Sequence, residues 1–286
     1  MSNEKNAPEN NEFAAAMLQP FEERAALAIQ EAPGDYRDEN GFLYCGICHK
    51  PKECVTPFGR KVKCTCGCET PHQKAMRKNA ANTRRSACFH NRAMHGWTFE
   101  HDNGQVPGIA AARRFVEEYK TVERENLGLL FWGNVGTGKS YAAACIANAL
   151  IDHGVDAYMT NFARILLELS PSAPKPQRDS FMHKLEAIEL LIIDDLGIER
   201  NSDFALEIIY TVIDARTIAE RPVIITTNLT PDMLTHEGND DKRRIYSRIL
   251  GMCTPVNFGG KDQRREIGRR KTQSARERLA EHPDTN

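Results

Sequence analysis

The sequence lacks any long apolar run. In a chain of 286 residues, no stretch approaches the roughly 18–20 apolar residues that a helix needs to span a bilayer. It also lacks a basic N-terminal segment followed by an apolar one, which is the pattern of a secretory signal peptide. We therefore expect no membrane-spanning segment, no membrane partner and a cytoplasmic location.

A large net charge is also missing, since 38 basic residues oppose 39 acidic ones. The charges are unevenly distributed along the chain. Residues 1–43 hold nine acidic and three basic side chains, whereas residues 50–92 hold eleven basic and two acidic ones. A basic segment of this density is a candidate contact for nucleic acid. The alternative is a solvated connector that binds nothing.

Cysteine is concentrated in one place, because six of the nine cysteines lie within residues 45–68. In a reducing compartment such a cluster favours metal ligands over disulfides. Two closely spaced cysteine pairs separated by about 12–20 residues are typical of a tetrahedral Zn²⁺ site. The predicted ligands are Cys45, Cys48, Cys64 and Cys66. Cys68 competes for the fourth position, and Cys54, His49 and His72 are possible substitutes; otherwise the thiols lie on an unstructured arm.

Residues 133–140 match the phosphate-binding loop pattern G-x-x-x-x-G-K-[ST]. An apolar run at residues 127–132 precedes the loop, and an alanine-rich helical run at residues 141–151 follows it. Glycines allow backbone N–H groups to surround phosphate oxygens, and the helix adds the positive end of its dipole. The pattern thus predicts a nucleotide site made of Gly133, Asn134, Val135, Gly136, Thr137, Gly138, Lys139, Ser140 and Tyr141.

Within this loop, Lys139 is expected to reach the β- and γ-phosphates, and the Ser140 hydroxyl to bind Mg²⁺. Further apolar strands are predicted at residues 155–159, 190–193 and 223–227, with helical segments between them. A cap at Thr160 or Asn161 is expected to begin one of these helices. Strands that are apolar on both faces and alternate with helices indicate an α/β fold, a parallel sheet covered by helices on both faces.

Polar residues end two of these predicted strands. Asp194 and Asp195 follow residues 190–193, at the sheet edge where open α/β sheets bind ligands. We expect Asp194 to support Mg²⁺ and Asp195 to polarise the attacking water. Asn228 follows residues 223–227, where an amide can hold this water or contact the γ-phosphate. Arg244 and Arg248 share one helical face, and either arginine could reach the γ-phosphate of a neighbouring subunit.

Together, residues 107–265 resemble the DnaC-type helicase loaders of the AAA+ class of P-loop ATPases, a group that includes DnaI and IstB. The segments that carry the resemblance are residues 133–140, 192–197, 213–216, 226–229, 244–249 and 258–264. It implies a RecA-like sheet, with Asn228 as the first sensor. It also implies Arg248 as the arginine finger and Arg264 as a second sensor on the γ-phosphate. Many such ATPases have glutamate where Asp195 stands.

Composition and pattern predict an organisation in four parts. Residues 1–72 are expected to form an acidic helix, near residues 21–30, and a zinc-binding module, which the resemblance implies grips the helicase. Residues 73–106 form a basic linker, residues 107–265 the AAA+ ATPase domain, and residues 266–286 a polar C-terminal tail. Candidate DNA contacts are Arg77, Lys78, Arg84, Arg85 and the helix that begins at Phe162.

The function implied is an ATP-dependent replication protein that loads a ring helicase onto single-stranded DNA. ATP and Mg²⁺ would bind between self-associated subunits, Zn²⁺ would bind the cysteines, and DNA would stimulate hydrolysis. Two alternatives are an IstB-type helper ATPase of transposition and an adaptor that binds the helicase without hydrolysing ATP.

Overall fold

The computed structural model describes residues 31–57, 59, 61–64, 67–69, 71–102, 104–197 and 202–280. It divides the chain into two compact units, residues 1–77 and 78–286, called here the N-terminal and C-terminal units. The acidic helix predicted near residues 21–30 lies outside the described residues. Among the described residues, no helix combines the length and the apolar character that crossing a membrane requires.

Two small hairpins form the strands of the described part of the N-terminal unit. Strands β1 (Tyr36–Arg37) and β2 (Leu43–Tyr44) pair antiparallel, as do β3 (Glu53–Val55) and β4 (Lys61–Lys63). Leu43 and Cys45 are the buried side chains here, within the part that the structure describes. So small a core supplies little of the burial that holds a larger domain together.

Residues 73–106, which were predicted as a linker, are largely helical. They contain most of α3 (Pro71–Cys88) and the 3₁₀ helices η1 (Arg92–Gly96) and η2 (Phe99–His101). Cys88, Phe89 and Phe99 are buried in the hydrophobic core of the C-terminal unit. From Ala81 onward this part of the chain therefore packs on the C-terminal unit, because the core of that unit takes its apolar side chains out of water.

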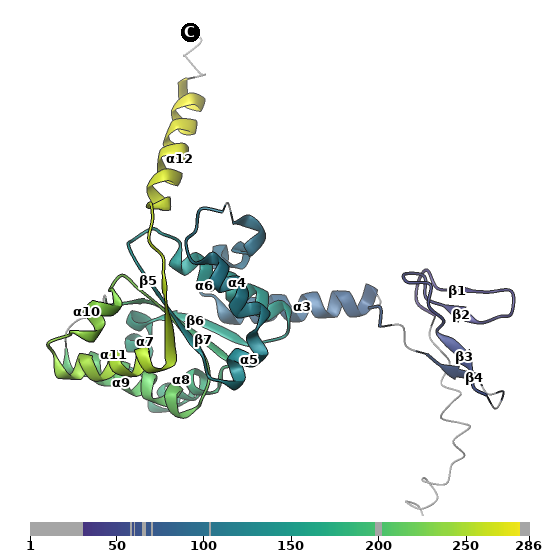
Figure 1. Ribbon diagram of the computed structural model, residues 1–286, viewed down its shortest axis with the longest axis horizontal. Coiled ribbons are helices and arrows are strands. Elements are labelled where there is room, and N and C mark those ends of the chain that lie inside the picture. The colour runs from purple at the N-terminus through teal and green to yellow at the C-terminus, as the bar shows by residue number, and fades with distance from the viewer. Residues whose placement is uncertain are drawn as a thin grey trace, which may run out of the picture. The chain divides into compact units, whose positions relative to one another are not determined.

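The C-terminal unit is built on a five-stranded parallel sheet of order β6-β7-β8-β5-β9 (Figure 1). Its strands are β5 (Gly128–Trp132), β6 (Ala157–Asn161), β7 (Leu190–Leu196), β8 (Val223–Thr227) and β9 (Cys253–Asn257). Four of them match the predicted apolar runs to within about two residues at their starts. The α/β class and the parallel sheet are confirmed.

Alternate residues of the strands enter two separate hydrophobic cores, as the two-residue period of a strand requires. Phe131 and Ile192 enter the first core, whereas Leu130 and Ile193 enter the second. The first core is covered by α4 (Ile109–Glu117), α5 (Tyr119–Arg124) and α6 (Lys139–Asp152). The second is covered by α7 (Phe162–Glu168), α8 (Lys175–Ala187), α9 (Asp203–Ile218), α10 (Pro231–Thr235) and α11 (Asp240–Met252). Helices thus cover both faces, as predicted.

Side-chain caps fix where several helices begin. Asn161 caps α7 by accepting a hydrogen bond from the Arg164 amide at 2.9 Å, which selects between the two predicted capping residues. Ser202 and Asn239 cap α9 and α11 in the same way. These caps place the first turns of the helices next to the carboxyl ends of the strands.

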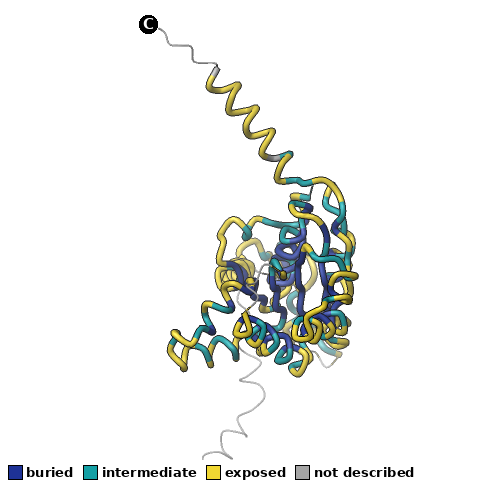
Figure 2. Tube along the Cα trace, turned by 90° about the vertical axis from the view of Figure 1, so that its left-hand side faces the viewer, coloured by how far each residue is buried: buried dark blue, intermediate teal, exposed yellow. Residues whose placement is uncertain are grey.

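The last element is α12 (Gln263–Ala280), an 18-residue helix. Its described side chains beyond Glu266 are exposed to solvent, and the helix extends away from the sheet (Figure 2). The prediction for this region was a polar tail from residue 266. The helix has no continuous apolar stripe, so the usual periodic signal for a helix was missing from its sequence.

Candidate nucleotide site

The sheet order brings the predicted motifs together. Strand β8 lies between β5 and β7, and all three run parallel. The phosphate loop follows β5, the two aspartates end β7, and Asn228 follows β8. Because parallel strands end at the same edge, three segments that lie far apart in the sequence meet in one place.

The phosphate loop is shaped by its glycines and by the segment before α12. Gly136 has a φ of 78°, in the left-handed region that glycine adopts freely. A Cβ at this position would collide with the Asp262 carboxylate. The Gln263 amide also donates to the Gly136 carbonyl at 2.8 Å. Hence the loop and the start of α12 pack directly against each other.

Lys139 is almost fully buried and its ammonium group makes three hydrogen bonds. It donates to the carbonyls of Gly133 and Asn134 at 2.7 and 2.8 Å, and to Asn228 Oδ1 at 2.8 Å. Burial lowers the pKa of Lys139, and the Asp195 and Asp194 carboxylates oppose this effect. The three acceptors hold the cation at the mouth of the loop, and they are neutral groups that phosphate oxygens can replace.

Asp194 is held by two hydroxyl groups. Ser140 Oγ donates to its Oδ1 at 2.8 Å, and Thr226 Oγ1 donates to the same oxygen at 2.6 Å. Burial raises the pKa of Asp194, and these two hydrogen bonds partly offset the rise. One hydroxyl and one carboxylate therefore stand side by side, which is a pair of oxygen ligands suited to Mg²⁺.

Asp195 has a backbone φ of 61°, which is uncommon for a residue other than glycine. Its amide donates to Thr226 Oγ1 at 2.9 Å, so the same threonine hydroxyl that donates to Asp194 fixes this turn. Its side chain lines the cavity described below. Strain of this kind persists where the surrounding structure holds it, and it is concentrated at functional sites.

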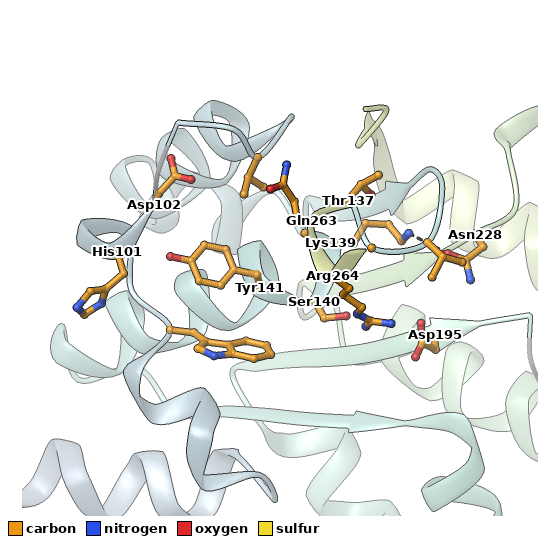
Figure 3. A pocket seen from close by; sticks show the side chains of 15 residues that line it. His101, Asp102, Thr137, Lys139, Ser140, Tyr141, Asp195, Asn228, Gln263 and Arg264 are labelled. Atoms are coloured by element: carbon orange, nitrogen blue, oxygen red, sulfur yellow. Dashed lines mark hydrogen bonds between the residues drawn. The ribbon is translucent and has the colours of Figure 1, made fainter. Parts of the chain in front are cut away.

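These elements enclose a cavity of about 390 Å³ (Figure 3). The lining residues are Trp97, His101, Asp102, Val106, Val135, Gly136, Thr137, Gly138, Lys139, Ser140, Tyr141, Asp195, Asn228, Gln263 and Arg264. Lys139, Asp195, Asn228 and Arg264 gather at one end, and His101, Asp102 and Tyr141 lie at the other. The cavity thus has a phosphate-binding end and a second end with aromatic and polar side chains.

Five of the lining residues were not predicted from the sequence. Trp97, His101, Asp102 and Val106 come from the segment between η1 and α4, and Gln263 comes from the start of α12. None of them belongs to a motif with fixed spacing, so only their placement in the fold reveals them. Conversely, Gly133, Asn134 and Asp194 were predicted and lie behind the cavity, where they hold Lys139 and Ser140.

The predicted arginines are in three different situations. Arg264 lines the cavity, and Figure 3 shows it directed toward Asp195. Arg248 forms an ion pair with Asp214 at 3.0 Å, and it donates to the Tyr210 hydroxyl at 2.7 Å. Arg244 is largely exposed. In this single chain Arg248 therefore links α11 to α9, through Asp214 and Tyr210.

Three of the clustered cysteines meet in the N-terminal unit. The sulfur atoms of Cys45, Cys48 and Cys68 lie within 4.8 Å of one another. Cys64, a predicted ligand, instead forms a disulfide with Cys54. Cys54 is opposite Val62 in the β3–β4 hairpin, and Cys64 lies two residues further along the chain than Val62, just beyond β4. Cys66 lies outside the described residues. Three thiolates at these distances suit Zn²⁺. Cys68, which was only an alternative to the predicted fourth ligand, is one of the three.

Most of the predicted DNA contacts have other partners. Arg84 pairs with Asp156 at 2.8 Å, and Arg85 pairs with Asp152 at 2.5 Å. Phe162 is 1% exposed, so its ring belongs to the core. In the single chain Arg84 and Arg85 thus pair within the C-terminal unit. DNA contact by these arginines or by the helix that begins at Phe162 stays a prediction.

A family model described as "IstB-like ATP binding protein" matches residues 68–272, which is more than half of the chain. The chain belongs to this family of ATP-binding proteins. The match includes every residue of the cavity. The chain is therefore an ATP-binding protein by family.

Two curated relatives share part of the IstB-like segment. The replicative helicase loader DnaC of Escherichia coli strain K12 is 28% identical over 134 residues, 46% of this chain and 54% of that protein. The replicative helicase loader DnaI of Bacillus subtilis strain 168 is 26% identical over 182 residues, 59% of this chain and 58% of that protein. The chain spans only a little over half the length of these relatives.

The fold has a counterpart among solved structures. The crystal structure of DnaI matches with a TM-score of 0.52 and 24% identity, and the match covers 63% of this chain and 98% of that one. At this identity the likeness concerns the fold alone. It supports the parallel α/β fold of the C-terminal unit.

Proposed function

We propose that this IstB-like protein is an ATPase that loads a replicative ring helicase onto single-stranded DNA. The observation that carries the proposal is the meeting of the phosphate loop, Asp194, Asp195 and Asn228 at the ends of β5, β7 and β8. The curated relatives of this chain are named replicative helicase loaders. ATP binding and hydrolysis would switch the affinity of the protein for DNA and for the helicase.

In the proposed ATP complex, the β- and γ-phosphates replace the three acceptors that hold Lys139. The loop amides and the start of α6 supply further positive potential. The base then lies toward Trp97, His101 and Tyr141 at the other end of the cavity. The cation is pre-positioned, so little reorganisation is needed when the phosphates arrive.

Mg²⁺ fits the adjacent oxygen ligands of Ser140 and Asp194. When bound, it neutralises charge on the β- and γ-phosphate oxygens. The Thr226 hydroxyl also donates to Asp194 Oδ1 and keeps this carboxylate in place. Ser140 and Asp194 would hold the ion beside the phosphate loop.

Hydrolysis requires a water aligned with the γ-phosphate. Asp195 is assigned as the base that polarises this water, and Asn228 as the amide that holds it. Arg264 lies near Asp195 at the same end of the cavity and stabilises the charge that develops on the phosphate oxygens. The shorter reach of aspartate compared with glutamate predicts slow turnover, which suits a switch.

Self-association through the ATP site would bring in an arginine from a neighbouring subunit. Arg248 is engaged with Asp214 in the single chain, whereas Arg244 is exposed on the same helix. We assign the finger to Arg248, which must leave Asp214 when subunits assemble. Arg244 is the alternative.

The N-terminal unit is proposed to bind Zn²⁺ and to contact the helicase. Cys45, Cys48 and Cys68 supply three thiolates, and Cys66 is the candidate for the fourth. The metal would contribute much of the folding free energy of a unit with so small a core.

A pull-down with the replicative hexameric helicase, with and without ATP, tests the proposal. We expect a complex whose yield changes with ATP, and no such change in Lys139→Ala. Absence of a complex in both conditions contradicts helicase loading, and recovery of a transposase favours the transposition helper. A complex without ATP hydrolysis favours the adaptor.

A further inference from the structure

Helix α12 is strongly basic. Its 18 residues include six arginines and one lysine, against two glutamates. None of the basic residues is buried. A charge run of this kind is often only a solvated surface, so the arrangement of the charges around the helix decides what it can do.

The two signs of charge lie on opposite halves of the helix. At 3.6 residues per turn, six cations fall within about half of the circumference, in two rows. One row contains Arg264, Lys271 and Arg278, and the other contains Arg265, Arg269 and Arg276. Glu266, Glu277 and the seventh cation, Arg270, fall on the opposite half.

Both glutamates already have partners on their own half. Arg270 pairs with Glu266 at 3.2 Å, and Gln273 donates to Glu277 at 3.1 Å. On the basic half, Arg265 contacts Asp262 at 3.4 Å. Within the residues that the structure describes, Arg269, Lys271, Arg276 and Arg278 form no ion pair. This segregation leaves one face of the helix with an uncompensated positive charge.

We propose that the basic half of α12 binds the phosphate backbone of single-stranded DNA, an inference that rests on the proposed function for the identity of the strand. The residues between the two rows are mostly small, and include Gly268, Thr272 and Ala275. A backbone can lie along them with cations on both sides. Arginine also suits phosphate because its donors form a planar fork.

Other anionic partners fit this face less well. An interfacial membrane helix presents a broad apolar face opposite its cations, whereas the half of α12 opposite its cations holds two glutamates and two glutamines. The basic half offers no aromatic side chain for stacking on bases. Binding would therefore be independent of sequence and strongly dependent on salt.

The start of α12 connects this face to the ATP site. The Gln263 amide is bonded to the Gly136 carbonyl of the phosphate loop, and Arg264 lines the cavity. Arg264 is also the first member of one cationic row. A change at the γ-phosphate thus acts on the first turn of the helix that holds the DNA.

The test is fluorescence anisotropy of a labelled oligo-dT strand with the full chain and with Arg269→Gln/Lys271→Gln/Arg276→Gln. These side chains lie outside the cavity. On a single strand, each phosphate contact contributes about 0.7 to the slope of the logarithm of the binding constant against the logarithm of the salt concentration. Losing three contacts therefore makes this slope less steep by about 2. At 0.1 M salt the same loss weakens binding roughly 100-fold.

The matched control is Lys120→Gln/Arg124→Gln/Arg270→Gln, which removes the same charge from α5 and from the acidic half of α12. It should bind the strand as the parent does. Both variants should keep the parent's ATP affinity and melting temperature.

Equal weakening in the two triple variants overturns the proposal, because only net charge would then matter. Absence of strand binding by the parent also overturns it, as does tighter α12-dependent binding to a duplex of the same length. The helicase pull-down tests the loader function independently of DNA binding by α12. A helicase complex without α12-dependent DNA binding would refute this inference and leave the proposed loader standing.

Discussion

The buried carboxylate of Asp194 costs the folded protein stability, and it is also the proposed ligand of Mg²⁺. Its carboxylate is buried and its pKa is raised, so the nucleotide-free protein holds an unfavourable charge. Ser140 and Thr226 both donate to one oxygen, Oδ1, and an asparagine carbonyl could accept the same two hydrogen bonds. We predict that Asp194→Asn melts no lower than the parent at pH 8 without nucleotide, whereas its Mg²⁺-dependent ATP hydrolysis is lost.

The dependence of this effect on pH follows from the direction of the shift. Because the pKa of Asp194 is raised in the folded state, protonation favours folding as the pH falls through that pKa. Any advantage in melting temperature of the asparagine variant is therefore largest at pH 8 and shrinks toward pH 5. A variant that melts well below the parent at pH 8 would contradict this account of the carboxylate.

At the level of single residues, the sequence predicted the motif positions and missed the other wall of the cavity. Lys139, Asp195 and Asn228 follow from spacing and from the ends of apolar strands. Trp97 and Asp102 come from the irregular segment around η2 (Phe99–His101), and only the packing of that segment on α6 brings them to the nucleotide. Tertiary placement of this kind leaves no local pattern in the sequence.

Among the helices and strands, α9 and α11 are joined by the Arg248–Asp214 ion pair, which is about one-third exposed at both side chains. If Arg248 is the finger, this pair competes with its use by a neighbouring subunit. We predict that Asp214→Asn increases ATP turnover at a given protein concentration, because it frees Arg248, and that Arg248→Ala abolishes the rise of turnover with concentration. Turnover measured over a concentration series checks both results.

Arg244→Ala is the matched control, since Arg244 lies one turn away and is exposed. It should behave as the parent does. If Arg244→Ala loses the concentration dependence and Arg248→Ala keeps it, the finger is Arg244.

The strands show why some elements were predictable and others were not. Strands β5, β7 and β8 are buried on both faces, so they read as apolar runs. Strand β9 is an edge strand with exposed residues and with Pro255, which cannot donate a hydrogen bond. Helix α12 likewise makes few contacts, and its sequence carries charge instead of an apolar stripe. Burial leaves a periodic signal in a sequence, and exposed elements lack it.

At the scale of the whole molecule, the two units have different sources of stability. The C-terminal unit has two hydrophobic cores on either side of its sheet. In the described part of the N-terminal unit only Leu43 and Cys45 are buried, beside the proposed zinc ligands Cys45, Cys48 and Cys68. We predict that Cys48→Ser lowers the bound zinc, measured by elemental analysis, from about one atom per chain to a small fraction of that. ATP affinity should be unchanged, and helicase binding should weaken.

Cys253→Ser is the control for a general effect of losing a thiol, because Cys253 is buried in the second hydrophobic core of the C-terminal unit. It should lower the melting temperature and keep the zinc. Zinc content that is unaffected by Cys48→Ser would remove the metal site from the account.

The most direct test of the central claim is a helicase-loading assay on circular single-stranded DNA with an annealed oligonucleotide. Displacement of the oligonucleotide by the replicative helicase reports loading, because a closed ring cannot thread onto a circle. We predict that this protein with ATP raises displacement several-fold and that Lys139→Ala does not. Equal displacement with the parent, with Lys139→Ala and with no added protein would contradict the account.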